Sequence, residues 1–302
     1  MRNRHPAIRH LTEPAAVRDV LRRGAPKWHL YGRALEHPVH GVVMLPNALP
    51  ERDKQIWAMR VRMRPGQFFS RRTAAELHDL PVAWASARAP IEIGGIRPVR
   101  PPRRPQVRGH QLQAGVLEYV PAGPGWLPSV EDTWCLLAQV ATKAELLAAG
   151  DFLVSGRTRY EEPRSSLIRL GVAAARFRGC AGGVLRSEVI PLIRTGVESP
   201  AESALRLVII EAGLSEPLTN CPVRVRGSTL HADLGYPRWR IAIEYDGAYH
   251  FGENKVKQAK RDISRARAME EAGWKVLRAT SLDLDRHGEF LHALRAAIAA
   301  RS

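Results

Sequence analysis

The C-terminal third of this chain carries an ordered series of local signals that restricts its fold more than any other sequence feature. A helix is predicted to begin at Ser199, a suitable N-cap followed by Pro200 and Glu202, and to end at Gly213. Three strand patterns follow at about residues 218–226, 229–236 and 239–246. A basic helix at about 254–272, a strand at 274–280 and a last helix at about 285–300 complete the series. The order α-β-β-β-α-β-α predicts a compact domain in residues 196–302.

The preceding residues carry weaker signals, which predict two further regions. Residues 1–82 are expected to hold short helices and one strand, which fits a basic winged-helix-like DNA-binding region or a plain helical adaptor. The expected helices lie at about residues 12–24, 26–35, 51–63 and 71–80, and the strand at 41–45. Residues 83–195 are expected to form a middle region with strand-like and mostly helical segments, whose sequence carries no catalytic constellation and fits a packing or spacer role. The predicted fold class is therefore α+β, with several domains.

One segment of the middle region cannot be helical. Residues 97–105 contain prolines every few positions, and proline both fixes the backbone and lacks an amide hydrogen. Strand-like patterns flank it at residues 91–96 and 106–120. We expect residues 97–105 to be a linker or an exposed basic loop.

The chain has an excess of positive charge that is concentrated near its N-terminus. It contains 46 Lys and Arg against 30 Asp and Glu, a net charge of +16, and residues 1–110 alone contain 21 basic and 8 acidic residues. Such a bias favours a polyanionic partner, although an arginine-rich composition caused by a high-GC genome is a competing explanation. The residues predicted to bind nucleic acid are Arg22, Arg23, Arg71, Arg72, Lys255 and Arg261.

Several classes of protein do not fit the sequence. The longest uncharged stretch, residues 37–50, is interrupted by prolines and is too short to span a bilayer. The N-terminus is rich in arginine and lacks the apolar segment of a secretory signal. Three widely spaced cysteines suit neither a disulfide framework nor a zinc site. We expect a cytoplasmic protein without a membrane partner.

Acidic residues gather on one predicted hairpin of the C-terminal domain. Alternation along residues 239–246 puts Ala242, Glu244 and Asp246 on one face of the strand, and a turn at Pro237-Arg238 puts Asp233 on the same face, across from Ala242. These acids are either solvated residues of an open sheet face or a group that holds a cation. Oxygen ligands suit Mg²⁺ or Mn²⁺, and such an ion can polarise a phosphoryl group for hydrolysis.

Basic residues follow the acids directly. His250 comes just after the strand and is a candidate proton donor to a leaving oxygen. The next helix is crowded with cations that are suited either to a solvated face or to contacts with phosphate: Lys255, Lys257, Lys260, Arg261, Arg265 and Arg267.

The arrangement of acids resembles a known nuclease superfamily. Glu202, followed by Asp233 and then Glu244 on a predicted αβββαβ core, resembles the PD-(D/E)XK superfamily. More narrowly, the segments 232–234, 243–250 and 273–278 resemble the Vsr-like (very-short-patch-repair endonuclease-like) domain over residues 196–302. Residues 70–78 resemble the winged-helix region of abortive-infection type IV antitoxins.

This resemblance implies metal-dependent cleavage of DNA. It makes Asp233 and Glu244 the ligands of Mg²⁺ or Mn²⁺, and Glu202 a supporting acid. The superfamily has a lysine two residues after the second acid, where this chain has Asp246. Either Lys257 or Lys260 substitutes for it, or Asp246 and His250 serve a Vsr-like variant, or the site is inactive and only binds nucleic acid.

Two functions are therefore expected as alternatives. The first is a Mg²⁺-dependent DNA endonuclease acting in DNA repair, in defence against mobile elements or in a system of the toxin–antitoxin kind. The second is a catalytically inactive, DNA-binding regulator of the type IV antitoxin kind.

Overall fold

A computed structural model describes most of the chain. The described residues are 6–9, 11–32, 34–82, 89–118, 127–156, 162–247 and 255–302, with only the backbone for 255–262. The chain divides into two compact units, residues 1–140 with 173–181, and residues 141–172 with 182–302. The described part contains helices and three separate open sheets, which confirms the expected α+β class. No helix in it is long and apolar enough to cross a membrane.

The first unit begins with short elements that differ from the prediction. The helix expected from residue 12 begins only at Val17, because Ala15 and Ala16 instead pair with Val43 and Val42 in a short antiparallel ladder. The elements of this unit are α1 Pro6–Arg9, β1 Ala15–Ala16, α2 Val17–Arg22, α3 Lys27–Leu30, β2 Val42–Val43, α4 Glu51–Arg60, β3 Gln67–Phe69, α5 Arg71–Leu77, β4 Ile91–Ile96, β5 Val107–Leu112 and α6 Val130–Leu137. The winged-helix arrangement stays a prediction.

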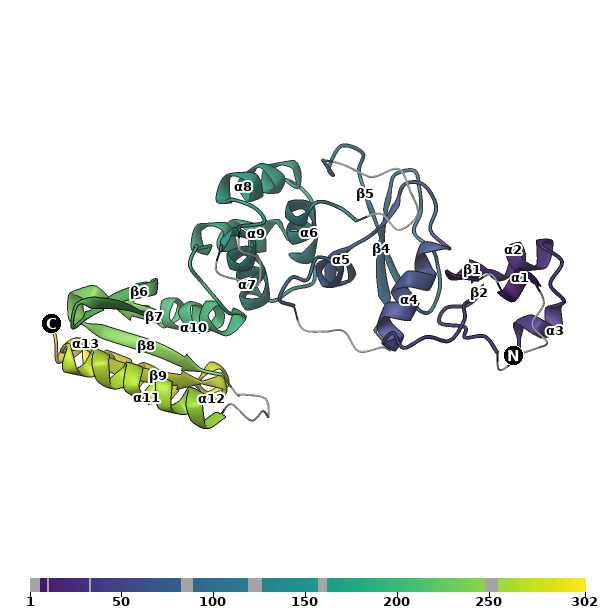
Figure 1. Ribbon diagram of the computed structural model, residues 1–302. Helices are drawn as coiled ribbons and strands as arrows, with labels where there is room; N and C mark the ends of the chain where they lie inside the picture. Colours follow the sequence, from purple (N-terminus) through teal and green to yellow (C-terminus); the bar gives the residue numbers. More distant parts are fainter. Residues whose placement is uncertain are drawn as a thin grey trace. The chain divides into compact units, whose positions relative to one another are not determined.

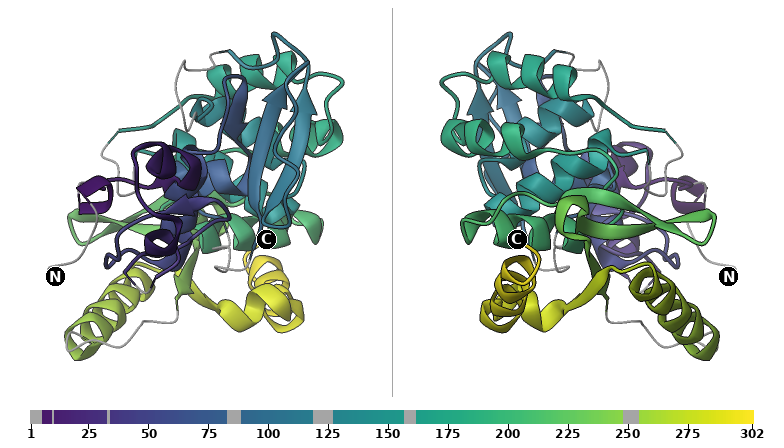
Figure 2. Two further views of the ribbon diagram at one scale, coloured as in Figure 1. Left: turned by 90° about the vertical axis from the view of Figure 1, so that its right-hand side faces the viewer. Right: turned by 90° about the vertical axis from the view of Figure 1, so that its left-hand side faces the viewer.

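The larger sheet of the first unit has the order β3-β4-β5 (Figure 1). Strands β4 and β5 run side by side in the same direction, as Figure 2 shows, although only residues 97–106 connect them and no helix lies between them. Parallel neighbours are usually joined through a helix. The proline-rich segment is thus a loop between two strand segments, as expected, and it forms the crossover between two parallel strands of one sheet.

The second unit contains the four-stranded sheet. Its elements are α7 Lys143–Val154, α9 Gly183–Val189, η1 Ile190–Leu192, α10 Pro200–Glu211, β6 Leu218–Val225, β7 Ser228–Tyr236, η2 Pro237–Trp239, β8 Ile241–Asp246, α11 Lys255–Glu271, β9 Lys275–Thr280, α12 Ser281–Asp285 and α13 Gly288–Ala299. Helix α8, Leu167–Arg176, spans the boundary between the two units. From α10 onward the order of elements is the predicted one, except that α12 and α13 replace a single last helix.

Helices cover both faces of this sheet, which has the order β6-β7-β8-β9 (Figure 1). On one face, side chains of α10 and α13 pack with Leu234, Ile241 and Ile243. On the other, Met269 of α11 packs with Cys221 and Ala242. The pairs β6–β7 and β7–β8 are antiparallel, whereas β8 and β9 are parallel. Helix α11 is the crossover that this parallel pair requires.

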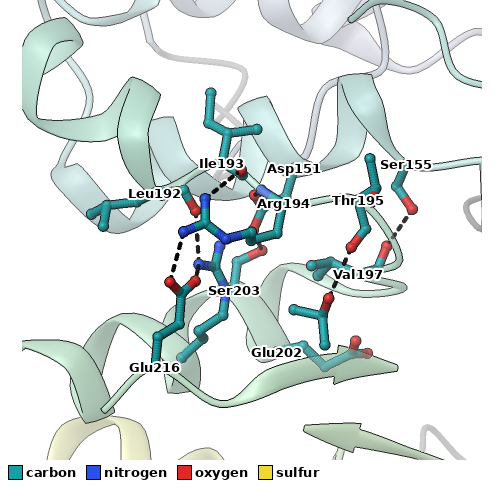
Figure 3. Close-up of polar contacts among 12 residues, drawn as sticks. Asp151, Ser155, Leu192, Ile193, Arg194, Thr195, Val197, Glu202, Ser203 and Glu216 are labelled. Atoms are coloured by element: carbon teal, nitrogen blue, oxygen red, sulfur yellow. Dashed lines mark hydrogen bonds and ion pairs between the residues drawn. The ribbon is translucent and has the colours of Figure 1, made fainter. Parts of the chain in front are cut away.

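A buried ion pair joins α7 to α10. Arg206 of α10 and Asp151 of α7 are fully buried, and Arg206 Nη2 lies 2.7 Å from Asp151 Oδ2. Ser203 Oγ donates to the same carboxylate at 2.8 Å, and the Arg194 amide donates to its other oxygen at 2.8 Å. Glu216 accepts from both arginines at 2.7 Å (Figure 3). The pair is thus surrounded by hydrogen bonds, which a buried charge requires.

Removing one charge of this pair is expected to destabilise the second unit. Asp151→Asn removes the fully buried counter-charge of Arg206 and leaves it paired with the partly exposed Glu216, and loss of a buried partner typically costs about 3–5 kcal/mol. Amide hydrogen exchange in peptides from α7 and α10 measures the change within this unit alone. The control is Lys143→Gln, which removes an exposed pair with Glu211 at 3.0 Å and should cost less than about 1 kcal/mol. Equal protection in the two variants would contradict the prediction.

Candidate active site

The register of the β7–β8 hairpin brings Asp233 level with Glu244. Leu234 pairs with Ile243 and Gly235 with Ala242, so Asp233 is not across from Ala242 as predicted. The turn is longer than expected, because Pro237–Trp239 forms a short 3₁₀ helix and Arg240 adopts the left-handed conformation with φ 50°. The predicted position was therefore wrong by two residues, although Asp233 remains beside Glu244.

The alternation of side chains along β7 breaks at Asp233. Ala232 packs on the α11 side of the sheet, whereas Leu234, two residues later, packs on the α10 side. Residues two apart in a regular strand face the same side, so the break marks a local irregularity. There the Tyr245 amide donates to Asp233 Oδ2 at 2.7 Å, so a side chain takes the place of a main-chain ladder partner. This bond fixes the carboxylate against β8.

Glu202 approaches the hairpin from the N-terminus of α10. Its amide donates to Ser199 Oγ at 3.3 Å, as expected of an N-cap. Its carboxylate accepts from the Glu198 amide at 3.0 Å, not from Ser199 as a capping box would require. The residue is only 6% exposed, and burial, with a further effect from the charge of Asp233, raises its pKa to about 7. Capping alone therefore does not account for its position.

Asp233 interacts electrostatically with both glutamates. Burial raises its own pKa. Burial and then the charge of Asp233 raise the pKa of Glu244 to about 7. Glu202, Asp233 and Arg265 line a shared cavity of about 300 Å³. Clustered acids with raised pKa values are typical of functional sites, because their repulsion is relieved by a cation or by a proton.

Arg265 is the basic residue beside the acids among the α11 cations whose side chains the structure describes. Its Nη2 donates to Glu244 Oε1 at 3.3 Å and also to the His231 carbonyl oxygen. Its Nε is buried and has no hydrogen-bond partner among the described residues. From sequence it was one of six similar residues on a helix. Only the packing of α11 against the sheet distinguishes it.

The remaining predicted catalytic residues lie at the edge of this group or outside the description. Asp246 is partly exposed and pairs with Arg278 of β9 at 3.2 Å. His250 lies outside the described residues. Lys255, Lys257, Lys260 and Arg261 belong to α11, but their side chains also lie outside the described part.

The four arginines of residues 1–82 that were predicted to bind nucleic acid fall into two pairs. Arg22 and Arg23 are exposed at the end of α2, where Arg22 lies 3.2 Å from Asp19. Arg71 and Arg72 are held by internal contacts, because Arg71 donates to Gln139 Oε1 at 2.8 Å and Arg72 to the Val140 carbonyl at 3.1 Å. These contacts argue against Arg71 and Arg72 as phosphate ligands.

The acids provide a donor set that suits Mg²⁺ only in part. Over the described ranges, no group of three or more His, Cys, Asp or Glu side chains is arranged to hold a metal ion. Mg²⁺ commonly uses one or two carboxylates and keeps several waters. Asp233 and Glu244 provide such a pair, and each has one oxygen with no hydrogen bond to another described residue. The pair fits a hydrated ion better than an enclosed metal centre.

Part of the chain is similar to two known proteins. The chain is 33% identical over 107 residues to two uncharacterized proteins of Mycobacterium tuberculosis, one from strain CDC 1551 / Oshkosh and one from strain ATCC 25618 / H37Rv. The matched part is 35% of this chain and 38% of each relative, so the chain spans well under half of their length. No protein-family model and no solved structure matches the chain.

The raised pKa of Glu202 predicts a pH-dependent stability. A carboxyl whose folded pKa is near 7, against 4.5 ordinarily, binds its proton more tightly in the folded state, so stability falls as pH rises from about 4.5 through 7. Glu202→Gln removes this titration and should reduce the fall by about 1–3 kcal/mol. Hydrogen exchange in α10 at a series of pH values, corrected for intrinsic rates, measures it. Glu289→Gln, at an exposed acid, should retain the wild-type dependence.

Proposed function

We propose that this protein is a Mg²⁺-dependent DNA endonuclease whose active site lies at Glu202, Asp233 and Glu244. The observation that carries the proposal is that the half-buried Asp233 carboxylate raises the pKa of two further acids, the buried Glu202 of α10 and the half-buried Glu244 of β8. Such a cluster of acids costs folding free energy. Binding of a cation and a substrate would relieve the repulsion between the carboxylates and so explain the cluster. The resemblance of the αβββαβ order to the PD-(D/E)XK superfamily gives the chemistry.

The proposed residues have different roles. Asp233 and Glu244 would hold the metal ion, which when bound polarises a phosphoryl oxygen and activates water. Arg265 keeps the Glu244 carboxylate in position through its hydrogen bond. A carboxyl with pKa near 7 exchanges its proton readily at neutral pH, so Glu202 is suited to take up or release a proton.

The missing lysine has a candidate replacement in this proposal. Asp246 occupies its position and is paired with Arg278. Arg265 provides a cation beside Glu244 and has an unused Nε–H. Because a guanidinium is always charged, it can stabilise phosphate charge but is a poor proton acceptor. Arg265 would therefore replace the electrostatic part of the lysine's role.

The alternative is a DNA-binding regulator without catalysis. The replacement of the superfamily's lysine by Asp246 favours this regulator. Asp246 is paired with Arg278, and its carboxylate cannot orient water as an amine would. The two functions share DNA as partner and differ in phosphodiester cleavage. A cleavage assay with matched variants separates them.

Loss of either proposed metal ligand should abolish cleavage. Asp233→Asn and Glu244→Gln keep the size of the side chain but remove a charged oxygen ligand. The rate of nicking of supercoiled plasmid in Mg²⁺ or Mn²⁺ should fall at least about a hundredfold, since metal stabilisation of a phosphoryl transition state is worth several kcal/mol. Glu270→Gln, at an exposed acid of α11, should keep wild-type activity. DNA binding without cleavage by the wild type under both metals would favour the regulator instead.

The role of Arg265 predicts a shift in the pH profile. Its charge lowers the pKa of Glu244, so Arg265→Gln should raise that pKa further and move the acid limb of the cleavage rate to higher pH. Arg265→Lys keeps the charge and should shift the limb less. A loss of rate with no shift in the limb would mean that Arg265 contributes only to folding.

A further inference from the structure

The first unit contains a second polar site that the proposed function does not use. A cavity of about 380 Å³ lies between the turn after α4 and the β4–β5 crossover. Five of its lining residues are arginines and one is glutamine: Arg62, Arg64, Gln67, Arg100, Arg103 and Arg104. None of the five arginines forms an ion pair with a carboxylate in the described part of the chain. We call this group the arginine pocket.

A buried glutamine joins the two sides of the arginine pocket. Gln67 of β3 is only 3% exposed. Its side-chain carbonyl accepts from the Arg64 amide at 2.9 Å, and its side-chain amide donates to the Arg100 carbonyl at 2.7 Å. The Arg64 turn and the crossover are therefore held at a fixed separation by one side chain with both polar atoms satisfied.

Glycines hold the crossover against the sheet. A Cβ at Gly95 would lie 2.5 Å from the Val99 carbonyl oxygen, and one at Gly109 would lie 2.5 Å from Pro101 Cγ. A Cβ at Gly66, which has φ 81°, would lie 2.9 Å from Val99 Cγ2. These contacts leave no room for side chains beneath the crossover. The arginines of the crossover therefore extend from a backbone that is packed against the sheet, so the fold fixes the shape of the pocket.

In the described part of the chain the pocket arginines form no ion pair, and only the more distant Asp19 acts on Arg62 with a negative charge. Burial, and then the positive charges of Arg104, Arg18 and Arg64, lower the pKa of Arg62. Like charges held together by a packed backbone repel each other unless an anion lies between them. Guanidinium groups bind phosphate oxygens through paired hydrogen bonds. Five such groups exceed the charge of one free phosphate and suit successive phosphodiesters.

We propose that the arginine pocket binds the phosphate backbone of duplex DNA. The choice of DNA as the polyanion rests on the proposed function, but binding here requires no cleavage. The pocket also replaces Arg71 and Arg72 as the expected contact of this unit, since those two arginines are held by Gln139 and Val140. Phosphate contacts of this kind position a protein on DNA without selecting a sequence.

The salt dependence of DNA binding tests this proposal. Each phosphate contact contributes about 0.9 to the slope of log K against log salt concentration. Arg103→Gln/Arg104→Gln in the full chain should reduce the slope by about 1.8, measured by fluorescence anisotropy of a labelled duplex with EDTA present. Arg60→Gln/Arg178→Gln removes the same charge from exposed positions outside the pocket and should change it little. Arg103→Lys/Arg104→Lys should restore most of the slope.

Two outcomes would overturn the proposal. One is that the pocket variant and the control variant have the same salt-dependence slope and the same DNA affinity, with circular dichroism showing that both are folded. Arg62→Gln repeats this comparison from the other side of the pocket. The other is that inorganic phosphate, at constant ionic strength, protects the pocket from hydrogen exchange while the variants leave DNA binding unaffected. The ligand of the pocket would then be a small phosphate and not DNA. Because binding is measured with EDTA present, it does not depend on cleavage, so a failure of the catalytic proposal is recognised separately.

Discussion

The second unit depends on the buried charge of Arg206. A guanidinium with no solvent exposure must be paired, and Asp151, Glu216 and the Leu192 carbonyl together provide its partners. These partners come from α7, from the segment after α9 and from the loop before β6. Because Arg206 lies one helical turn after Glu202, the same contacts fix the end of α10 that carries the candidate acid. Residues 141–172 therefore support the site although they contribute no carboxylate to its cavity.

The candidate site combines burial with like charge. Glu202 and Glu244 both have pKa values of about 7, and Asp233 contributes to both shifts. Neither hydrogen bonding to a backbone amide nor the nearby Arg265 offsets the desolvation. Sites that bind charged ligands commonly lower the free energy of unfolding of the ligand-free protein for this reason. The arginine pocket of the first unit also gathers like charges, although Arg64, Arg100 and Arg103 are exposed.

Local signals predicted the elements of the second unit well and their pairing less well. The helix capped by Ser199 and the strands up to Thr280 were predicted to within a few residues, because caps and alternation are properties of neighbouring residues. The β7–β8 register was missed, because nothing in the sequence indicates the left-handed conformation of Arg240. Arg71 and Arg72 were predicted to contact nucleic acid. Their internal partners Gln139 and Val140 could not be foreseen, because they are distant in sequence. The arginine pocket was missed for the same reason, since it depends on the parallel pairing of β4 and β5.

The turn between β7 and β8 has a consequence for any comparison of this domain with others. Shifting a strand by one residue moves every side chain to the opposite face of the sheet. An insertion or deletion within Pro237–Arg240 would therefore leave Asp233 and Glu244 in the sequence while separating their carboxylates in space. Two chains that share both acids but differ in the length of this turn would not share the site, so the spacing between the acids is as much a determinant of chemistry as the acids themselves.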